Sequence, residues 1–566
     1  MIENVLSTSN KWYPLDKRDT VRDLKELVDY TSRKYGERNA FTWEDDDEKE
    51  VNISFNRFRQ EIDALGSAFY EKGIKNERIV LLGESSYLWV LTYFAGANGG
   101  SAIVPLDKNL SAEQLEVLVK DSEAGVLVYS KDFADIAADI KSEKLKLRLN
   151  LHTDILKMIE SGKELVAKNA PSAKEFIEHK VDAEKMAAII YTSGTTGISK
   201  GVMLSHKNLA SNINQVTPAA EIYGRELLVL PLNHSFAFTA CILCSHYYGC
   251  DIAINKSLTN ILADMQKFKP DSILLVPLFV EKFYARIWAN AEKSGKAKLL
   301  RKMIKVSNFL LKFGIDLRRK LFKAVHQAFG GNLVLIVTGG APIDERYIQG
   351  FRELGIITIN GYGITECSPV VSVNRNYWQK PGSIGYILPG IKIKIFEPDE
   401  KGMGEICVQG DNVMMGYYNN PEATREAFLS GGNDGKWFRT GDIGYKDEDD
   451  FLYISGRKKN LIILSNGENV SPEGIEQEIM AEMPYVQEVV VFQDDAENMI
   501  VAEAYFNPEY IEQTGTHDVD YARKFARDIV AYNRKQPPQK NIGKTLVRDE
   551  EFPKTTTKKI KRNYNK

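Results

Sequence analysis

The sequence lacks an apolar run long enough to cross a bilayer. A membrane-spanning helix needs about 20 consecutive apolar residues, whereas the apolar segment between Asp271 and Glu281 is interrupted and too short. The first residues, Met1 to Ser7, also lack the basic flank and the long apolar core of a signal peptide. We therefore expect a soluble protein located in the cytoplasm.

Cysteine is scarce, with 5 residues in a chain of 566, which is typical of proteins from a reducing compartment. Cys241, Cys244 and Cys250 lie close to His246 and raise the question of a zinc site. The segment 236–250 that holds them is apolar and ends near a glycine, as a buried helix does. Zinc ligands usually lie on turns with a longer gap between the pairs. The buried helix is therefore the favoured interpretation, and zinc binding is the alternative.

The chain has little net charge. A formal value of -3 gives no reason to expect nucleic-acid binding. One segment differs, because residues 281–323 hold 13 Lys and Arg against 3 Asp and Glu, with apolar residues interleaved at helical spacing. Such a stretch lies either on an anionic membrane surface or, more often, as a solvated helix face whose other side packs in the core. Peripheral membrane contact through 281–323 stays open beside the second interpretation.

Short apolar runs alternate with stretches of helical spacing along most of the chain. The apolar runs are predicted strands, at 78–82, 101–105, 124–129, 227–230, 272–276 and 333–337. The alternation predicts a layered α/β fold. A chain of 566 residues is longer than a single hydrophobic core usually supports, so we expect two or more domains. Beyond about residue 460 the pattern changes to a helix at 472–483 and two strands at 488–492 and 500–506, which predicts a small C-terminal α+β domain.

The most informative segment is 191–201, with the sequence Tyr-Thr-Ser-Gly-Thr-Thr-Gly-Ile-Ser-Lys-Gly. Its glycines let the backbone come close to a ligand, its hydroxyls add donors, and Lys200 adds a positive charge. Apolar strand patterns lie on both sides, so the loop joins two strands. A Walker loop instead joins a strand to a helix and has its lysine next to the last glycine. The pattern indicates a phosphate-holding loop of a different kind.

This loop and the segment 201–206 that follows it resemble the signature of the adenylate-forming superfamily. That superfamily includes acyl-CoA synthetases, luciferases and the adenylation domains of peptide synthetases. The resemblance implies an enzyme that binds ATP and Mg²⁺, with Thr195 contributing to the metal site. The loop residues that would contact the ATP phosphates are Thr192, Ser193, Gly194, Thr195, Thr196, Gly197 and Lys200. One departure is visible, since Ser199 stands where the family usually has proline before the lysine.

Two further segments resemble motifs that surround the adenine. In 360–368, Asn-Gly-Tyr-Gly-Ile-Thr-Glu-Cys-Ser, the resemblance implies that Tyr362 stacks on the base beside Gly363, that Thr365 touches the phosphate and that Glu366 binds magnesium. A carboxylate is a suitable ligand for that ion. The turn Gly339-Gly340-Ala341 follows a predicted strand and would line the adenine pocket.

The resemblance extends to the C-terminal part of the chain. Asp442 and Arg457 match the residues that contact the ribose, and Lys459 matches the hinge between the domains. The implied domains are an N-terminal adenylation domain at 1–456, a hinge at 457–460 and a mobile C-terminal α+β domain at 461–566.

Two segments of the C-terminal domain match motifs that act in the reaction. The segment 552–562 resembles the motif P-K-T-x-x-G-K-I-x-R, so Lys559 aligns with the catalytic lysine that bridges the substrate carboxylate and the ATP phosphate. Lys558 replaces the glycine of that motif. The loop near Gly467 would line the path of the pantetheine arm of coenzyme A.

The acid substrate is inferred from the segment 230–239, which aligns with a lining of the acyl pocket. His234 matches a family histidine near the substrate carboxylate and is a candidate catalytic residue. No acidic residue lies between Pro231 and Tyr248, so the ammonium of an amino acid would be buried without a partner, which costs several kcal/mol. An apolar acid is therefore favoured.

The sequences of these motifs are most similar to those of bacterial long-chain fatty acid–CoA ligases. We therefore expect fatty acid and coenzyme A as substrates. Three alternatives remain: transfer of the acyl group to a separate acyl carrier protein, activation of another apolar or aryl acid, and a non-catalytic nucleotide- or acyl-binding protein at a membrane. A luciferase-like oxygenase is the least favoured, because most family members lack that second activity.

Overall fold

The computed structural model describes residues 15–192, 199–429, 435–463, 469–494, 497, 499–554 and 560–562. The chain divides into two compact units, and each is described by itself. The first unit comprises Met1–Ile393, Val408–Phe438 and Asp447–Leu452, and the second comprises Lys394–Cys407, Arg439–Lys446 and Tyr453–Lys566.

The first unit contains a seven-stranded sheet with the strand order β18-β8-β7-β4-β3-β5-β6. Strands β7, β4, β3, β5 and β6 are parallel, with β6 at one edge of the sheet, and β8 and β18 extend the other side in the antiparallel sense. The bounds are β3 Arg78–Leu82, β4 Ala102–Leu106, β5 Val126–Tyr129, β6 Leu147–Asn150, β7 Met186–Thr192, β8 Lys200–Ser205 and β18 Gly416–Tyr417. Strands β3, β4 and β5 are nearly continuous buried apolar runs because both of their faces are covered. The edge strand β6 instead contains the exposed Arg148.

A nine-stranded sheet forms the other half of this unit, in the order β15-β14-β13-β12-β11-β9-β10-β1-β2. The run from β13 to β1 is parallel, and antiparallel strands close both edges. The bounds are β1 Asn39–Glu44, β2 Glu50–Ser54, β9 Arg225–Leu228, β10 Asp251–Ile254, β11 Ser272–Leu275, β12 Leu335–Gly339, β13 Ile357–Gly363, β14 Val370–Val373 and β15 Tyr386–Ile387.

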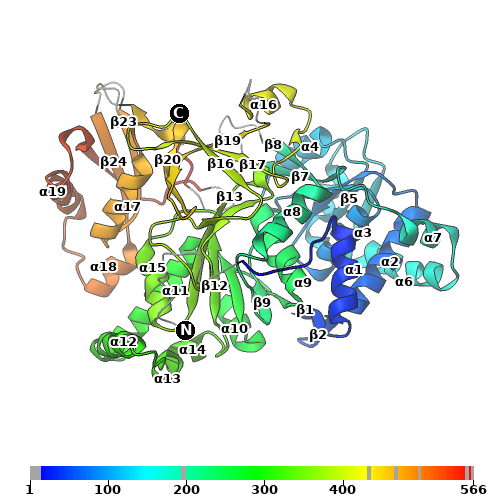
Figure 1. The fold of residues 1–566 in the computed structure, drawn as a ribbon, viewed down its shortest axis with the longest axis horizontal. Coiled ribbons are helices and arrows are strands. Elements are labelled where there is room, and N and C mark those ends of the chain that lie inside the picture. The colour runs from blue at the N-terminus through cyan, green and yellow to red at the C-terminus, as the bar shows by residue number, and fades with distance from the viewer. Residues whose placement is uncertain are drawn as a thin grey trace. The chain divides into compact units, whose positions relative to one another are not determined.

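Helices pack against both sheets. Helix α2 contacts α1, α3, α6 and α7, while α11 lies against β11 and β12, and α15 lies against β13 (Figure 1). The first helices are α1 Leu24–Tyr35, α2 Phe55–Glu71, α3 Tyr87–Asn98, α4 Ala112–Asp121, α5 Ala134–Asp139, α6 Leu156–Ala167, α7 Pro171–Glu178 and α8 His206–Val216. The others are α9 Ser245–Tyr248, α10 Ile261–Phe268, α11 Pro277–Lys293, α12 Ala297–Leu311, α13 Arg318–Leu321, α14 Lys323–Ala328, α15 Glu345–Glu353 and α16 Pro421–Glu426.

The second unit is an α+β structure. Helix α17 packs on β23 and α19 packs on β25, enclosing an apolar core that includes Ile479, Val491 and Phe525 (Figure 1). Its three-stranded sheet and helices are β23 Val486–Asp494, β24 Met499–Phe506, β25 Ile542–Arg548, α17 Pro472–Glu482, α18 Pro508–Thr514 and α19 Tyr521–Asn533. A four-stranded sheet, most of whose residues belong to this unit, has the order β16-β17-β19-β20, with β16 Lys392–Phe396, β17 Gly404–Gln409, β19 Phe438–Lys446 and β20 Leu452–Arg457. A two-stranded pair, β21 Ile462–Ile463 and β22 Asn469–Val470, completes it.

The predicted fold class is confirmed: a large layered α/β part is followed by a smaller α+β part. The predicted strands at 78–82, 101–105, 124–129 and 272–276 match observed strands to within two residues. The strands predicted at 227–230 and 333–337 exist but are shifted by two residues, to β9 and β12. Among the described residues, no helix is long and apolar enough to cross a membrane.

Candidate active site

The predicted phosphate loop joins two paired strands. Strands β7 and β8 run antiparallel, with Thr192 opposite Lys200 at the point where the described backbone reaches the loop. The Thr192 hydroxyl donates to the Lys200 carbonyl at 3.5 Å. Strands therefore flank the predicted loop on both sides, as the sequence predicts. Its central residues Ser193, Gly194, Thr195, Thr196 and Gly197 lie outside the described residues.

The two adenine motifs meet at one edge of the nine-stranded sheet. Strands β12 and β13 are parallel, and Gly339 lies opposite Gly361 in their register. The turn Gly339-Gly340-Ala341 and the segment 362–366 therefore leave the sheet side by side, at the carboxyl ends of their strands. Ligand sites of open α/β sheets lie at this edge.

Two glycines of these motifs are required by the backbone. Gly340 has a φ of 81°, a conformation that other residues rarely adopt. A Cβ atom on Gly363 would lie 2.2 Å from the carbonyl oxygen of Pro369, which no real contact allows. The motif Gly361-Tyr362-Gly363 therefore needs its second glycine for close packing, quite apart from any ligand.

Glu366 is held by a tyrosine that the sequence analysis did not identify. The Tyr417 hydroxyl donates to the Glu366 carboxylate at 2.9 Å, and the Met414 amide donates to the Glu366 carbonyl at 2.8 Å. Burial and the neighbouring Glu366 raise the pKa of the Tyr417 hydroxyl, so the phenol stays protonated and acts as the donor. Glu366 makes no ion pair with any described residue, and its carboxylate is therefore available to a cation.

Tyr417 also connects this carboxylate to the phosphate loop. It lies on β18, which pairs with β8 directly beyond the loop, with Tyr417 opposite Val202. The Lys200 ammonium lies 5.0 Å from the centre of the Tyr417 ring, a cation–π distance. A single side chain thus contacts both Lys200 and Glu366. Because Tyr417 is 51 residues from Glu366 in sequence, no local pattern predicts this pairing.

The segment predicted to line the acyl pocket lies against the adenine motif. The Ser235 hydroxyl is 3.1 Å from the Thr365 hydroxyl, and Thr239 donates to the Ser368 carbonyl at 3.0 Å. His234 precedes Ser235 and is half-buried. The structure therefore brings the neighbour of His234 next to Thr365.

The segment that raised the question of zinc is a buried helix. Residues Ala237–Cys244 form a π-helix that continues into α9 and ends at Gly249 in the left-handed conformation. His246 shares a hydrogen bond of 2.9 Å with the Thr31 hydroxyl and packs against Phe41, Phe55 and Phe58. Burial lowers the pKa of His246 to about 3, so the imidazole stays neutral. These are the contacts of a core histidine.

The two residues predicted to contact the ribose form an ion pair in the second unit. Asp442 follows Gly441, whose φ is 71°, and its side chain is only 5% exposed. Arg457, at the end of β20, places its Nε 2.9 Å from the Asp442 carboxylate. The pair would present oxygen acceptors and guanidinium donors to a sugar. Two other predicted residues of this unit, Gly467 and Lys559, lie outside the described residues.

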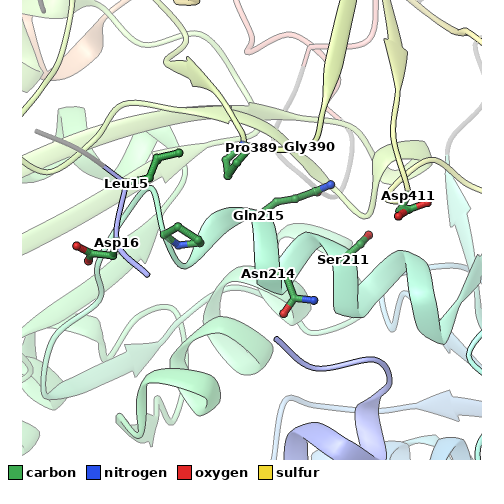
Figure 2. A pocket seen from close by; sticks show the side chains of 9 residues that line it. Leu15, Asp16, Ser211, Asn214, Gln215, Pro389, Gly390 and Asp411 are labelled. Atoms are coloured by element: carbon green, nitrogen blue, oxygen red, sulfur yellow. The ribbon is translucent and has the colours of Figure 1, made fainter. Parts of the chain in front are cut away.

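A surface cavity of about 420 Å³ lies elsewhere on the first unit. It is bordered by Asn214 and Gln215 of α8, by Pro389 and by Asp411 (Figure 2). Its described lining includes none of the predicted site residues. The cavity is therefore distinct from the candidate site.

The described residues of the candidate site in the first unit lie at the carboxyl ends of parallel strands, where open α/β sheets bind their ligands. Comparison with known proteins gives the family. Residues 28–418 match the family described as AMP-binding enzyme, and residues 459–565 match the AMP-binding enzyme C-terminal domain. The chain therefore belongs to the adenylate-forming superfamily of AMP-binding enzymes, and it is a ligase of that class.

Comparison with individual proteins gives the same family. The chain is 31% identical over 461 residues to the long-chain-fatty-acid–CoA ligase FadD15 of Mycobacterium bovis, covering 77% of this chain and 74% of that protein. It is 27% identical to the chloroplastic long-chain-fatty-acid–[acyl-carrier-protein] ligase AEE15 of Arabidopsis thaliana, covering 82% and 74%. The crystal structure of ATP-bound MatB from Rhodopseudomonas palustris superposes with a TM-score of 0.72 at 22% identity, covering 96% and 98%, and so has the same fold.

Proposed function

We propose that this protein activates a fatty acid with ATP to an acyl-adenylate and then transfers the acyl group to coenzyme A, releasing AMP. The observation that carries the proposal is that Tyr417 joins Lys200 of the seven-stranded sheet to Glu366, which follows β13 of the nine-stranded sheet, next to the Thr365–Ser235 contact. A relative at 31% identity is named as a long-chain fatty acid ligase. We propose that the reaction takes place in the cytoplasm, because cysteine is scarce, with 5 residues in 566, as in proteins of a reducing compartment.

The chemistry requires two anions to approach. The substrate carboxylate attacks the α-phosphorus of ATP, and the bond to pyrophosphate breaks. Repulsion between two unit charges at about 4 Å is roughly 4 kcal/mol at an effective dielectric of 20. Lys200, Lys559 and the loop amides would offset this repulsion by binding the phosphates.

Glu366 fits the role of magnesium ligand. Its carboxylate accepts one hydrogen bond from Tyr417 and has no cationic partner in the described part of the chain. Such a carboxylate favours a hard divalent cation. A magnesium ion bound there, with Thr195 as a further ligand, would neutralise phosphate charge. Tyr417 would then orient the ligand, as outer hydrogen-bond partners of metal ligands do.

The second step needs a thiol. An acyl-adenylate is a mixed anhydride, so a thiolate can attack the acyl carbon while AMP leaves. We propose that the C-terminal domain turns about Lys459 between the two steps and that the loop near Gly467 lines the path of the pantetheine arm. Burial and the neighbouring Arg457 lower the pKa of Lys459.

The main alternative concerns the thiol that accepts the acyl group. One relative is named as a ligase for acyl carrier protein, so transfer to a carrier protein is the second candidate function. We would measure AMP formation by the purified protein with ATP, magnesium and saturated fatty acids of increasing length. Each acid would be tested with coenzyme A, with a carrier protein and without a thiol.

We expect turnover that depends on coenzyme A and passes through an optimum in chain length. Turnover with the carrier protein alone would transfer the proposal to the second acceptor. A preference for aryl acids over all fatty acids would contradict the fatty acid assignment while leaving adenylation in place. Absence of AMP and pyrophosphate release under every condition would contradict catalysis.

Replacing Asp442 with alanine is expected to weaken ATP binding by roughly tenfold to a hundredfold. The loss of charge-assisted hydrogen bonds to a sugar costs about 1.5–3 kcal/mol. Calorimetric titration with a non-hydrolysable ATP analogue would measure the affinity. The matched control is Asp447→Ala, since the Asp447 carboxylate pairs with Lys380 in the first unit and has no proposed ligand contact. Equal affinity in wild type and Asp442→Ala would refute the ribose role.

A further inference from the structure

Helix α12 and the turn after it expose five large apolar side chains. The exposed fractions are 53% for Leu299, 47% for Val306, 58% for Phe309, 66% for Phe313 and 47% for Ile315. We refer to these five residues as the α12 crest. Phe309 and Phe313 touch each other, with ring centres 5.2 Å apart. Isolated exposed apolar residues are common, but several large ones on one helix and the turn after it mark an interaction surface.

The crest is not the face by which α12 is attached to the protein. Leu300, Met303 and Ile304 of the same helix pack on the apolar core beneath the nine-stranded sheet. Leu299, Val306 and Phe309 are spaced by seven and three residues, so they form a separate stripe along the helix. Helix α12 lies at the periphery of the first unit, beside α11 and α15 (Figure 1). The crest therefore faces away from the body of that unit.

Unpaired lysines border the crest. Lys298, Lys302, Lys305 and Lys312 are exposed, and none of them forms an ion pair with another described residue. Arg301 differs, because it pairs with Glu292 at 3.0 Å. At 100° per residue Lys298, Lys305 and Lys312 fall on the side of the crest away from the core-facing stripe, and Lys302 falls within the crest. The surface thus combines protruding aromatic rings with a row of uncompensated positive charge.

We propose that the α12 crest and its lysines bind the surface of a lipid bilayer that contains anionic lipids. Helices with basic and bulky apolar residues side by side lie in the membrane interface, with the apolar groups in the acyl boundary and the ammonium groups at the phosphates. A second copy of the chain is a poor occupant, because a twofold contact would bring lysines against lysines. The sequence left two interpretations of 281–323. One face of α12 packs on the core, as the second interpretation expects, and our proposal assigns another face of the same helix to a membrane.

Vesicle co-sedimentation tests the proposal with the full chain. Vesicles of phosphatidylcholine alone would be compared with vesicles that also contain phosphatidylglycerol, each at low and high salt. We expect binding to the anionic vesicles that weakens as salt increases. In Lys302→Gln/Lys305→Gln, binding should fall by about 30-fold, since each lysine near an anionic surface contributes roughly fivefold. Phe309→Ser/Phe313→Ser should lose binding at both salt concentrations.

The matched control changes one exposed leucine and one exposed lysine on a different helix, and this lysine forms no ion pair with another described residue. Leu156→Ser/Lys157→Gln on α6 does this, with Leu156 being 45% exposed, and it should bind vesicles like the wild type. All variants should unfold at the wild-type temperature, since the changed side chains are exposed. The assay does not require catalysis, so its outcome is independent of the proposed function.

Three results would overturn the proposal. The wild-type protein could fail to sediment with anionic vesicles, or the crest variant could bind as well as the control. Light scattering could also reveal a wild-type dimer that Phe309→Ser/Phe313→Ser converts to a monomer, in which case the crest covers a second copy instead.

Discussion

Replacing Glu366 with glutamine is expected to reduce magnesium-dependent pyrophosphate release by about 10²- to 10³-fold, the usual effect of removing one group that stabilises transition-state charge. The substitution keeps the size of the side chain and an acceptor for the Tyr417 hydroxyl, so the local fold should persist. It removes the negative charge that would hold the cation. Unfolding temperatures measured without nucleotide should therefore match the wild type.

A second measurement separates the metal role from a general loss of activity. Calorimetric titration of Mg²⁺ in the presence of a non-hydrolysable ATP analogue should give weaker metal binding in Glu366→Gln. Metal binding as tight as in the wild type would contradict the assignment of Glu366, whatever the rate of the reaction.

The pair Tyr417→Phe and Tyr418→Phe tests whether Tyr417 positions the carboxylate. The first variant removes the hydroxyl that donates to Glu366 but keeps the ring beneath Lys200. The second removes a hydroxyl that donates to Glu123 instead, at 2.8 Å. We expect Tyr417→Phe alone to raise the magnesium concentration for half-maximal activity, by about 10- to 100-fold. Equal behaviour of the two variants would eliminate the positioning role.

Apolar periodicity predicted where strands lie but misplaced the ends of two of them. Strand β9 begins at Arg225 and Glu226, two polar residues that an apolar run excludes. Arg225 pairs with Asp251 at 2.7 Å. Glu226 is buried and bonded to the Ser245 hydroxyl, and burial raises its pKa to about 8. Polar residues satisfied by tertiary partners extend the strand, and a single sequence gives no sign of those partners.

In the candidate site, too, some features depend on residues that are close in sequence and others on residues that are far apart in sequence. The need for Gly340 is local, because it arises from the positive φ of the turn. Gly363 is needed for close packing against the Pro369 carbonyl, and the sequence indicated it only through the resemblance of its motif. Tyr417 could not be predicted from the sequence, because its role arises from the pairing of β18 with β8 and from the approach of Glu366 out of another sheet. Contacts of this kind depend on the topology of the fold. The motifs that resemble the family indicated the site residues, whereas the contacts that position these residues depend on the topology.

Lys559→Ala is expected to slow adenylation by about 10³-fold while leaving ATP affinity nearly unchanged. A cation between the substrate carboxylate and the α-phosphate offsets roughly 4 kcal/mol of repulsion at about 4 Å, and 1.4 kcal/mol corresponds to a factor of ten in rate. Lys559 lies outside the described residues, so the expectation rests on the C-terminal motif. Single-turnover pyrophosphate release would measure the adenylation step.

The neighbouring lysine provides the control, because Lys558 replaces the glycine of the motif and carries the same charge one residue away. Lys558→Ala should react at close to the wild-type rate if Lys559 is the acting residue. The opposite result, a large loss in Lys558→Ala alone, would assign the role to Lys558. A further comparison uses acyl-adenylate supplied ready-made together with coenzyme A. Thioester formation should survive in Lys559→Ala, because AMP is already joined to the acyl group and the repulsion that the lysine offsets no longer has to be overcome.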